Sequence, residues 1–162
     1  MKKNYLLFLF LCYVSTYAQT FYINSLPQPY EDLVNEVDLS TCSSTDIYLC
    51  PPGAEEYYYD IAIDISQNLY FSTADGNLYR RNLNNVNSCE HLGSFGATVN
   101  GLTADPGKFV YASGNYGIYK YDVLENTFSY MGSLPDDCYS GGDLFFFEGR
   151  LSLPHIMVLR LF

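Results

Sequence analysis

The chain has 162 residues, of which 8 are Lys or Arg and 18 are Asp or Glu, giving a formal net charge of −10. This length fits one domain. An acidic chain without a basic run repels phosphate backbones and anionic lipid, so the charge argues against nucleic acid and membrane surfaces as partners. No segment after the N-terminal leader is long and apolar enough to predict a membrane span.

The first 18 residues are typical of a secretory signal peptide. A positive start is followed by an apolar run over residues 5–14, and Thr16 and Ala18 are small residues at the −3 and −1 positions of a cleavage site. A lipoprotein signal at Cys12 is disfavoured because bulky residues precede it. We therefore expect cleavage after Ala18 and a protein that is secreted or held at the cell surface.

Four cysteines follow the leader, and in an exported protein an even number predicts disulfides with three possible pairings. The short separation favours a clip between the first two cysteines, and elimination then pairs the last two. The spacing matches no zinc site, because there is no CxxC motif and both histidines are isolated. The four are Cys42, Cys50, Cys89 and Cys138.

The first strands after the leader resemble half of a unit that recurs further on. Residues 20–25, TFYINS, predict one strand. Residues 33–50, LVNEVDLSTCSSTDIYLC, resemble the later stretch LYRRNLNNVNSCEHLG, with Leu39 opposite Leu83. This region is interpreted as the outer half of a repeat unit.

Two full units then follow in tandem. Gly132 lies 39 residues after Gly93, and Tyr119 lies 40 residues after Tyr79. Each unit contains short apolar or alternating runs separated by Gly, Asn, Asp or Pro turns, which predicts antiparallel strands in a meander. We expect the inner strand of each unit to be the most apolar and the outer strand the most polar. The runs are residues 61–65, 69–73, 78–83 and a strand ending at 93, then 102–104, 109–113, 118–123 and a strand ending at 132.

The unit restarts near the C-terminus and then departs from the pattern. Asp143–Phe147 predicts an inner strand, residues 148–149 a turn, and residues 151–153 a second strand. The following PHIMVLRLF lacks the Gly/Asn turn of the other copies, whereas a shifted reading frame permits a turn such as Thr-Ser-Tyr-Asn-Gly. Residues 154–162 are therefore interpreted as an aberrant, out-of-frame tail of a truncated gene, the alternative being a divergent last strand.

Four strands in about 40 residues, repeated in tandem, are typical of β-propeller blades. We predict an all-β fold, a partial β-propeller over residues 19–153 with about two full four-stranded blades and two halves. A β-sandwich or solenoid with a coincidental repeat is the alternative. Because propellers close with about 4–8 blades, open sheet faces and edges predict a chain that is marginally stable or aggregation-prone alone.

Three strings carry a family resemblance: DISQNLYFSTADGNLYR, VNGLTADPGKFVYASGNYGIYKYD and GGDLFFFEGRLSL. They resemble blades of secreted β-propellers of the NHL/gluconolactonase-like, six-bladed type, as found in extracellular, type IX-secreted propeller proteins of gliding bacteria. The resemblance implies the architecture of a truncated fragment of such a protein, and it is unspecific for activity.

Two functions follow as hypotheses. The first is a binding module for an extracellular protein or polysaccharide, without a catalytic site or cofactor. The 17 tyrosines suit such a surface and suit blade packing equally well. No nucleophile elbow, P-loop or HExxH motif occurs in the sequence.

The second hypothesis is a metal-dependent, lactonase-like hydrolase, as the gluconolactonase resemblance implies. It requires oxygen ligands that converge on the central channel. We expect two of the candidates to be structural, because Asp64 and Asp105 occupy the same place before a turn, where Asx side chains bond nearby backbone N–H groups. The candidates at inner-strand ends are Asp60, Asp64, Asn100, Asp105 and Asp143.

Overall fold

The computed structural model describes residues 20–25, 33–48, 50, 58–85, 88–114, 116–135 and 138–157. The predicted signal peptide and residues 158–162 lie outside this part of the chain. The regular structure within it consists of strands, and no helix there is long and apolar enough to cross a membrane. The chain divides into two compact units, residues 1–48 and 49–162.

The N-terminal unit contains a three-stranded antiparallel sheet in the order β1-β2-β3. The predicted strand at residues 20–25 and the two predicted around Leu39 are confirmed. Val34 is fully buried, and Asn35 donates a hydrogen bond to Asp46 across the sheet at 2.6 Å. The strands are β1 (Thr20–Ser25), β2 (Leu33–Asp38) and β3 (Ser43–Tyr48).

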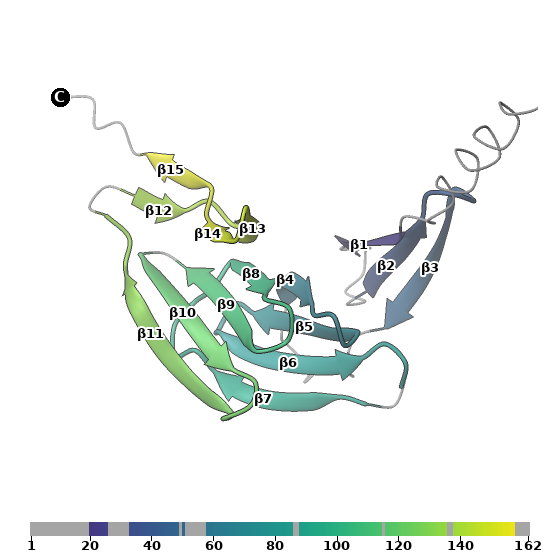
Figure 1. Ribbon diagram of the computed structural model, residues 1–162, viewed down its shortest axis with the longest axis horizontal. Coiled ribbons are helices and arrows are strands. Elements are labelled where there is room, and N and C mark those ends of the chain that lie inside the picture. The colour runs from purple at the N-terminus through teal and green to yellow at the C-terminus, as the bar shows by residue number, and fades with distance from the viewer. Residues whose placement is uncertain are drawn as a thin grey trace, which may run out of the picture. The chain divides into compact units, whose positions relative to one another are not determined.

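The second unit contains two four-stranded antiparallel sheets, as the repeat predicted (Figure 1). Blade 1 has the order β4-β5-β6-β7, and blade 2 has the order β8-β9-β10-β11. Blade 1 consists of β4 (Tyr58–Ile63), β5 (Asn68–Thr73), β6 (Asn77–Asn82) and β7 (Glu90–Ser94). Blade 2 consists of β8 (Gly101–Ala104), β9 (Phe109–Gly114), β10 (Gly117–Asp122) and β11 (Thr127–Ser133).

The two blades share an irregularity at the same place. The pairing of the third with the fourth strand shifts register between Leu78 and Tyr79 in blade 1, and between Ile118 and Tyr119 in blade 2. A glycine with positive φ stands opposite each shift, and at Gly93 (φ 133°) an added Cβ would lie 2.8 Å from the Phe128 ring. Both glycines therefore permit a β-bulge, and Gly93 also permits the close approach of blade 2.

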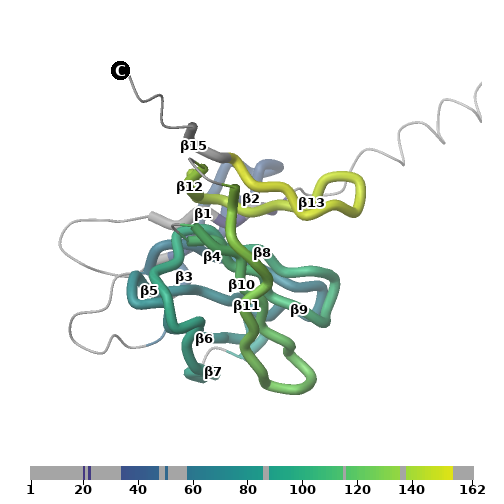
Figure 2. The backbone as a smooth tube through the Cα atoms, turned by 90° about the vertical axis from the view of Figure 1, so that its left-hand side faces the viewer, coloured from purple at the N-terminus to yellow at the C-terminus, as the bar shows by residue number. Residues whose placement is uncertain are grey.

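The hydrophobic core lies between blade 1 and blade 2, where β4 runs beside β8 (Figure 2). The sequence predicts the inner strand as the most apolar of each blade, whereas burial in blade 1 is greatest in the second strand: β5 has five consecutive buried residues, and β4 has two, Tyr58 and Ala62. The core residues are Ala62, Tyr70, Leu78, Phe95, Val99, Leu102, Val110, Ala112 and Tyr121.

A C-terminal hairpin follows blade 2, with β12 paired to β15 and β13 paired to β14. The predicted strand before residues 148–149 and the strand after this turn are confirmed. Residues 155–157, inside the predicted aberrant tail, form β15, and the reading-frame interpretation stays a prediction. The strands are β12 (Cys138–Ser140), β13 (Phe145–Phe147), β14 (Arg150–Ser152) and β15 (His155–Met157).

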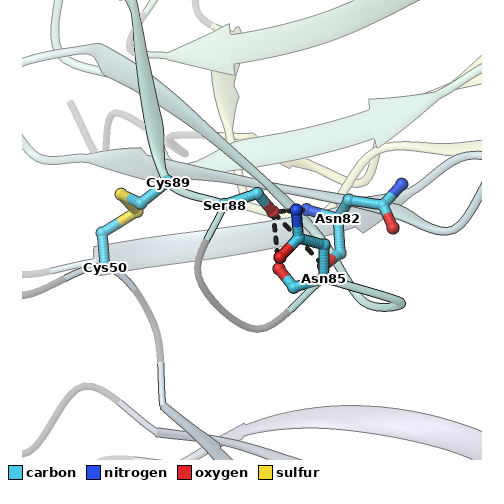
Figure 3. Close-up of a disulfide and its surroundings, with 5 residues drawn as sticks. All are labelled: Cys50, Asn82, Asn85, Ser88 and Cys89. Carbon is cyan, nitrogen blue, oxygen red and sulfur yellow. Dashed lines mark hydrogen bonds between the residues drawn. A yellow bond between two sulfur atoms is a disulfide. The ribbon is translucent and has the colours of Figure 1, made fainter.

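The disulfide joins Cys50 to Cys89, with 5.5 Å between their Cα atoms (Figure 3), so the expected pairing of Cys42 with Cys50 is wrong. Between Cys42 and Cys50 lies β3, six extended residues that run away from Cys42 at about 3.3 Å each, so the short sequence separation does not produce a tight loop. The pairing of Cys89 with Cys138 by elimination is wrong with it. Cys42 and Cys138 are free thiols in the described part of the chain.

The segment that leads to Cys89 is fixed by hydrogen bonds (Figure 3). The N–H of Asn82 donates to Ser88 Oγ at 2.8 Å, and this hydroxyl donates to the carbonyl of Asn85 at 2.7 Å. These bonds hold the start of β7 beside the end of β6, which positions Cys89 for its disulfide.

Candidate functional site

Asp64 organises the turn between β4 and β5. Its Oδ1 accepts hydrogen bonds from the N–H groups of Ser66 at 2.8 Å and Asn68 at 3.0 Å. Its Oδ2 accepts from Asn68 Nδ2 at 2.8 Å and from the Tyr70 hydroxyl at 3.1 Å. Burial, together with the Asp64 charge, raises the pKa of Tyr70 to about 12. Both oxygens of the Asp64 carboxylate accept hydrogen bonds from the turn or from Tyr70, which confirms the structural role predicted for Asp64.

Asp105 does the same at the equivalent turn of blade 2. Its Oδ1 accepts hydrogen bonds from the N–H groups of Gly107, Lys108 and Phe109 at 3.2, 2.7 and 2.8 Å. Its structural role in the turn is therefore also confirmed.

Asp60 lies where blade 1 meets blade 2. Its Oδ1 accepts the N–H of Ile61 at 2.8 Å, and its Oδ2 accepts the N–H of Leu102, in β8, at 2.6 Å. Burial raises the pKa of Asp60 to about 6, with a further contribution from the negative charge of Asp143. Asp60 therefore ties the two inner strands together and is a carboxyl group that titrates near neutral pH.

Asn100 and Asp143 lie near Asp60, at the start of the next two inner strands. Asn100 Nδ2 donates to the carbonyl of Ser140 at 3.2 Å, whereas Asn100 Oδ1 is buried without a hydrogen-bond partner. A Cβ on Gly101 would lie 3.2 Å from the backbone nitrogen of Asp143. Asp60, Asn100 and Asp143, three of the five predicted candidates, thus lie at neighbouring backbone positions, and we call them the inner-strand cluster.

The inner-strand cluster fits a divalent cation in part. Carboxylate and amide oxygens are the ligands that calcium and magnesium prefer, but both oxygens of Asp60 already accept backbone N–H groups. Among the described residues, no group of three or more His, Cys, Asp or Glu side chains gathers to hold a metal ion. A cation at this cluster would depend on Asp143 and on the amide oxygen of Asn100.

A second feature, which sequence reasoning missed, lies on blade 2. The Phe109 ring has the ammonium groups of Lys108 and Lys120 at 4.7 and 4.6 Å from its centroid. The Tyr111 ring lies 6.0 Å from that of Phe109, centroid to centroid. We call these four residues the lysine–aromatic face. The sequence carries no signal for this face, because the matched runs 69–73 and 109–113 place Phe109 opposite the apolar Leu69. In the structure the N–H of Asp64 donates to the carbonyl of Asn68 as the N–H of Asp105 donates to that of Phe109, so Phe109 stands where blade 1 has Asn68.

Alternation along β9 explains how this face arises. Val110 and Ala112 point into the core and are fully buried, so Phe109 and Tyr111 point to the opposite side of the sheet. There the C-terminal hairpin covers part of blade 2, and the Phe146 ring lies 5.7 Å from that of Tyr111. Phe109 and Tyr111 are half-buried and Lys108 is exposed, so the face is accessible from solvent.

No protein-family model matches the chain, and no curated protein matches it. Among solved structures, the chain is similar to a gluconolactonase from Xanthomonas campestris, with a TM-score of 0.58 and 14% identity over 81% of this chain and 44% of that one. It is also similar to U3-55K, with a TM-score of 0.50 and 17% identity over 76% of this chain and 42% of that one. These similarities show the fold, which is part of a β-propeller, and the chain spans less than half the length of either protein.

Proposed function

We propose that this chain is an exported binding module of the propeller type that takes an extracellular polysaccharide on its lysine–aromatic face. The observation that carries the proposal is the Phe109 ring with two lysine ammonium groups at 4.7 and 4.6 Å from its centroid, at a position where the turn of blade 1 has Asn68. The predicted signal peptide, and the resemblance to secreted propeller proteins of gliding bacteria, support export and an extracellular partner.

The chemistry of the face suits a neutral sugar chain. The C–H faces of sugar rings pack on aromatic rings, which combine an apolar body with polar neighbours. Lysine ammonium groups offer three donors each for ring hydroxyls. The chain's net charge of −10 repels polyanions, which favours a neutral polysaccharide over an acidic one.

Affinity electrophoresis in native gels cast with neutral glucans, xylans or mannans tests this proposal. We expect one of these polymers to retard the protein, and Phe109→Ala to weaken the retardation by about tenfold, a hot-spot loss of about 1.4 kcal/mol. Tyr130→Ala is the matched control, because Tyr130 is an exposed aromatic residue on β11. Unchanged mobility in every polymer, or equal losses in both variants, would contradict the proposal.

A second candidate is the lactonase-like hydrolase, and the unpartnered Asn100 Oδ1 favours it. The inner-strand cluster would hold a divalent cation, which supplies a Lewis acid for a lactone carbonyl. Asp60 would add a nearby negative charge without binding the cation, and because burial raises its pKa to about 6, this charge is present mainly above pH 6.

Thermal melts with and without calcium or zinc test the second candidate. A cation that binds the folded state raises the melting temperature, and we expect a larger rise above pH 6 than below it, because Asp60 is then ionised. Asp143→Asn should abolish the rise and Asp105→Asn should keep it. No rise with any divalent cation would remove this candidate and leave the binding proposal intact.

A further inference from the structure

The C-terminal hairpin presents three consecutive phenylalanines to solvent. Phe145, Phe146 and Phe147 are 47, 39 and 62% exposed. Side chains alternate along a strand, and Phe146 contacts Tyr111 of blade 2, so Phe145 and Phe147 point away from blade 2. An exposed apolar patch of this kind marks an interaction surface.

The rim of this patch carries one charge of each sign. Arg150 stands directly opposite Phe147 in the pairing of β13 with β14, and Ser152 stands opposite Phe145. Glu148 is in the two-residue turn, with a φ of 48°. Glu148 and Arg150 are both exposed, and the ion pair of the described residues is elsewhere, between Arg80 and Glu90. The patch therefore combines an apolar centre with an unpaired acid and an unpaired base.

We propose that this hairpin face, formed by Phe145, Phe147, Glu148 and Arg150, binds a second copy of this chain about a two-fold axis. In a two-fold interface the same patch meets itself, so the patch must complement itself. Here the phenylalanines of the two copies pack together, and Arg150 of each copy lies beside Glu148 of the partner subunit. The opposite sign of the two rim charges satisfies this requirement, which a patch with a single sign of charge would not.

The other side of the hairpin shows that this sheet packs by the same kind of contact. Phe146 and Leu151 are cross-strand partners on the side of blade 2, where Phe146 meets Tyr111 edge to face. The second copy continues this stacking of aromatic sheet faces by one further layer. The area of two short hairpins lies at the low end for specific interfaces, so we expect a dissociation constant of about 1–100 μM.

Analytical ultracentrifugation of the full chain across a dilution series tests the proposal. We expect a monomer–dimer equilibrium, and about 30-fold or greater weakening in the double variant Phe145→Ser, Phe147→Ser, the size of a central hot-spot loss. Tyr130→Ser is the control for loss of an exposed aromatic group elsewhere and should leave the equilibrium unchanged. A wild-type chain that stays monomeric, or association that survives the double variant, overturns the proposal.

A charge exchange separates this interface from general aggregation and does not disturb the apolar residues. Arg150→Glu and Glu148→Arg should each weaken the dimer by about tenfold, because like charges then meet across the axis. The variant with both changes should recover wild-type association. Lys108→Glu changes the net charge by the same amount as Arg150→Glu and should have no effect. Failure of the double change to restore dimerisation, with melting curves unchanged, overturns the proposal.

Discussion

Blade 1 and blade 2 are copies of one repeat, yet equivalent serines in them have different surroundings. Ser113 of blade 2 faces the C-terminal hairpin, and its hydroxyl lies 2.9 Å from that of Ser140. Ser72 lies 41 residues earlier and is also fully buried, but its hydroxyl has no partner. The residue 41 positions before Ser140 is Val99, which has no polar side-chain atom. Equivalent positions in the repeat therefore place equivalent side chains, and the residue present in the following sheet determines whether the buried hydroxyl finds a hydrogen-bond partner.

The turn aspartates differ in the same way. Asp64 binds its own turn and also the hydroxyl of Tyr70, inside the core. Asp105 binds only backbone N–H groups in the bonds of its turn. Tyr111, which corresponds to Tyr70, lies on the partly covered lysine–aromatic face. The bond to the core residue Tyr70 therefore makes Asp64 part of the packed interior, whereas Asp105 remains a local turn residue.

The largest expected difference between the blades is at these aspartates. Asp64→Ala should lower the free energy of unfolding by about 3–4 kcal/mol, because it leaves a buried tyrosine hydroxyl and two N–H groups without their acceptor. Asp105→Ala should cost about 1–2 kcal/mol, the range for losing a local side-chain cap. Urea denaturation measures both. Equal losses would show that the extra bond to Tyr70 contributes nothing.

The disulfide is a constraint on blade 1 for which the described part of blade 2 has no counterpart. The chain-entropy model gives about 3–4 kcal/mol for closing a loop of this size, and the two cysteines are 39 residues apart. Replacing Cys50 and Cys89 by Ser should lower the free energy of unfolding by up to that amount. Replacing Cys42 and Cys138 by Ser is the control and should be nearly neutral. Denaturation under oxidising conditions distinguishes the two double variants, and the reverse order would contradict the observed pairing.

The carboxyl group of Asp60, at the boundary between the blades, should also make the free energy of unfolding depend on pH. Asp60 has a pKa of about 6 in the folded chain, above its unfolded value, so the folded state holds a proton that the unfolded state releases. Stability attributable to Asp60 is therefore present below about pH 4 and lost as the pH rises through 6. The loss is on the order of 1–3 kcal/mol. Denaturation at pH 4.5 and 7.5 should show a smaller difference in Asp60→Asn than in wild type, and an equal difference would refute this assignment.

The smallest expected effects concern the two serines. Ser113→Ala should destabilise the chain by about 1 kcal/mol, because the buried hydroxyl of Ser140 loses the Ser113 hydroxyl and keeps only the longer bond from the N–H of Gly142. Ser72→Ala should be neutral or slightly stabilising, because it removes a buried polar atom that has no partner. Thermal melts of the two variants are a matched pair. A destabilised Ser72→Ala chain would mean that this hydroxyl has a partner after all.

Sequence reasoning succeeded where local patterns decide the outcome. The strands, their turns and the roles of Asp64 and Asp105 follow from alternation and turn chemistry within a few residues. It failed where distant segments meet. The cysteine pairing depends on the approach of two segments 39 residues apart, the link from Asp60 to Leu102 depends on two strands in different blades, and the greater burial of β5 depends on what packs on its two faces. None of these is visible in a single stretch of sequence.

The central claim is that successive sheets stack so that position 113 of blade 2 meets position 140 of the hairpin, whereas position 72 has no such polar partner. A double-mutant cycle measures this directly from the unfolding free energies of Ser113→Ala, Ser140→Ala and the double variant. We expect a coupling energy of about 1 kcal/mol for this pair. The matched cycle on Ser72→Ala and Val99→Ala should give a coupling near zero. Additive losses in the first cycle, or equal coupling in both, would contradict the stacking of the hairpin on blade 2.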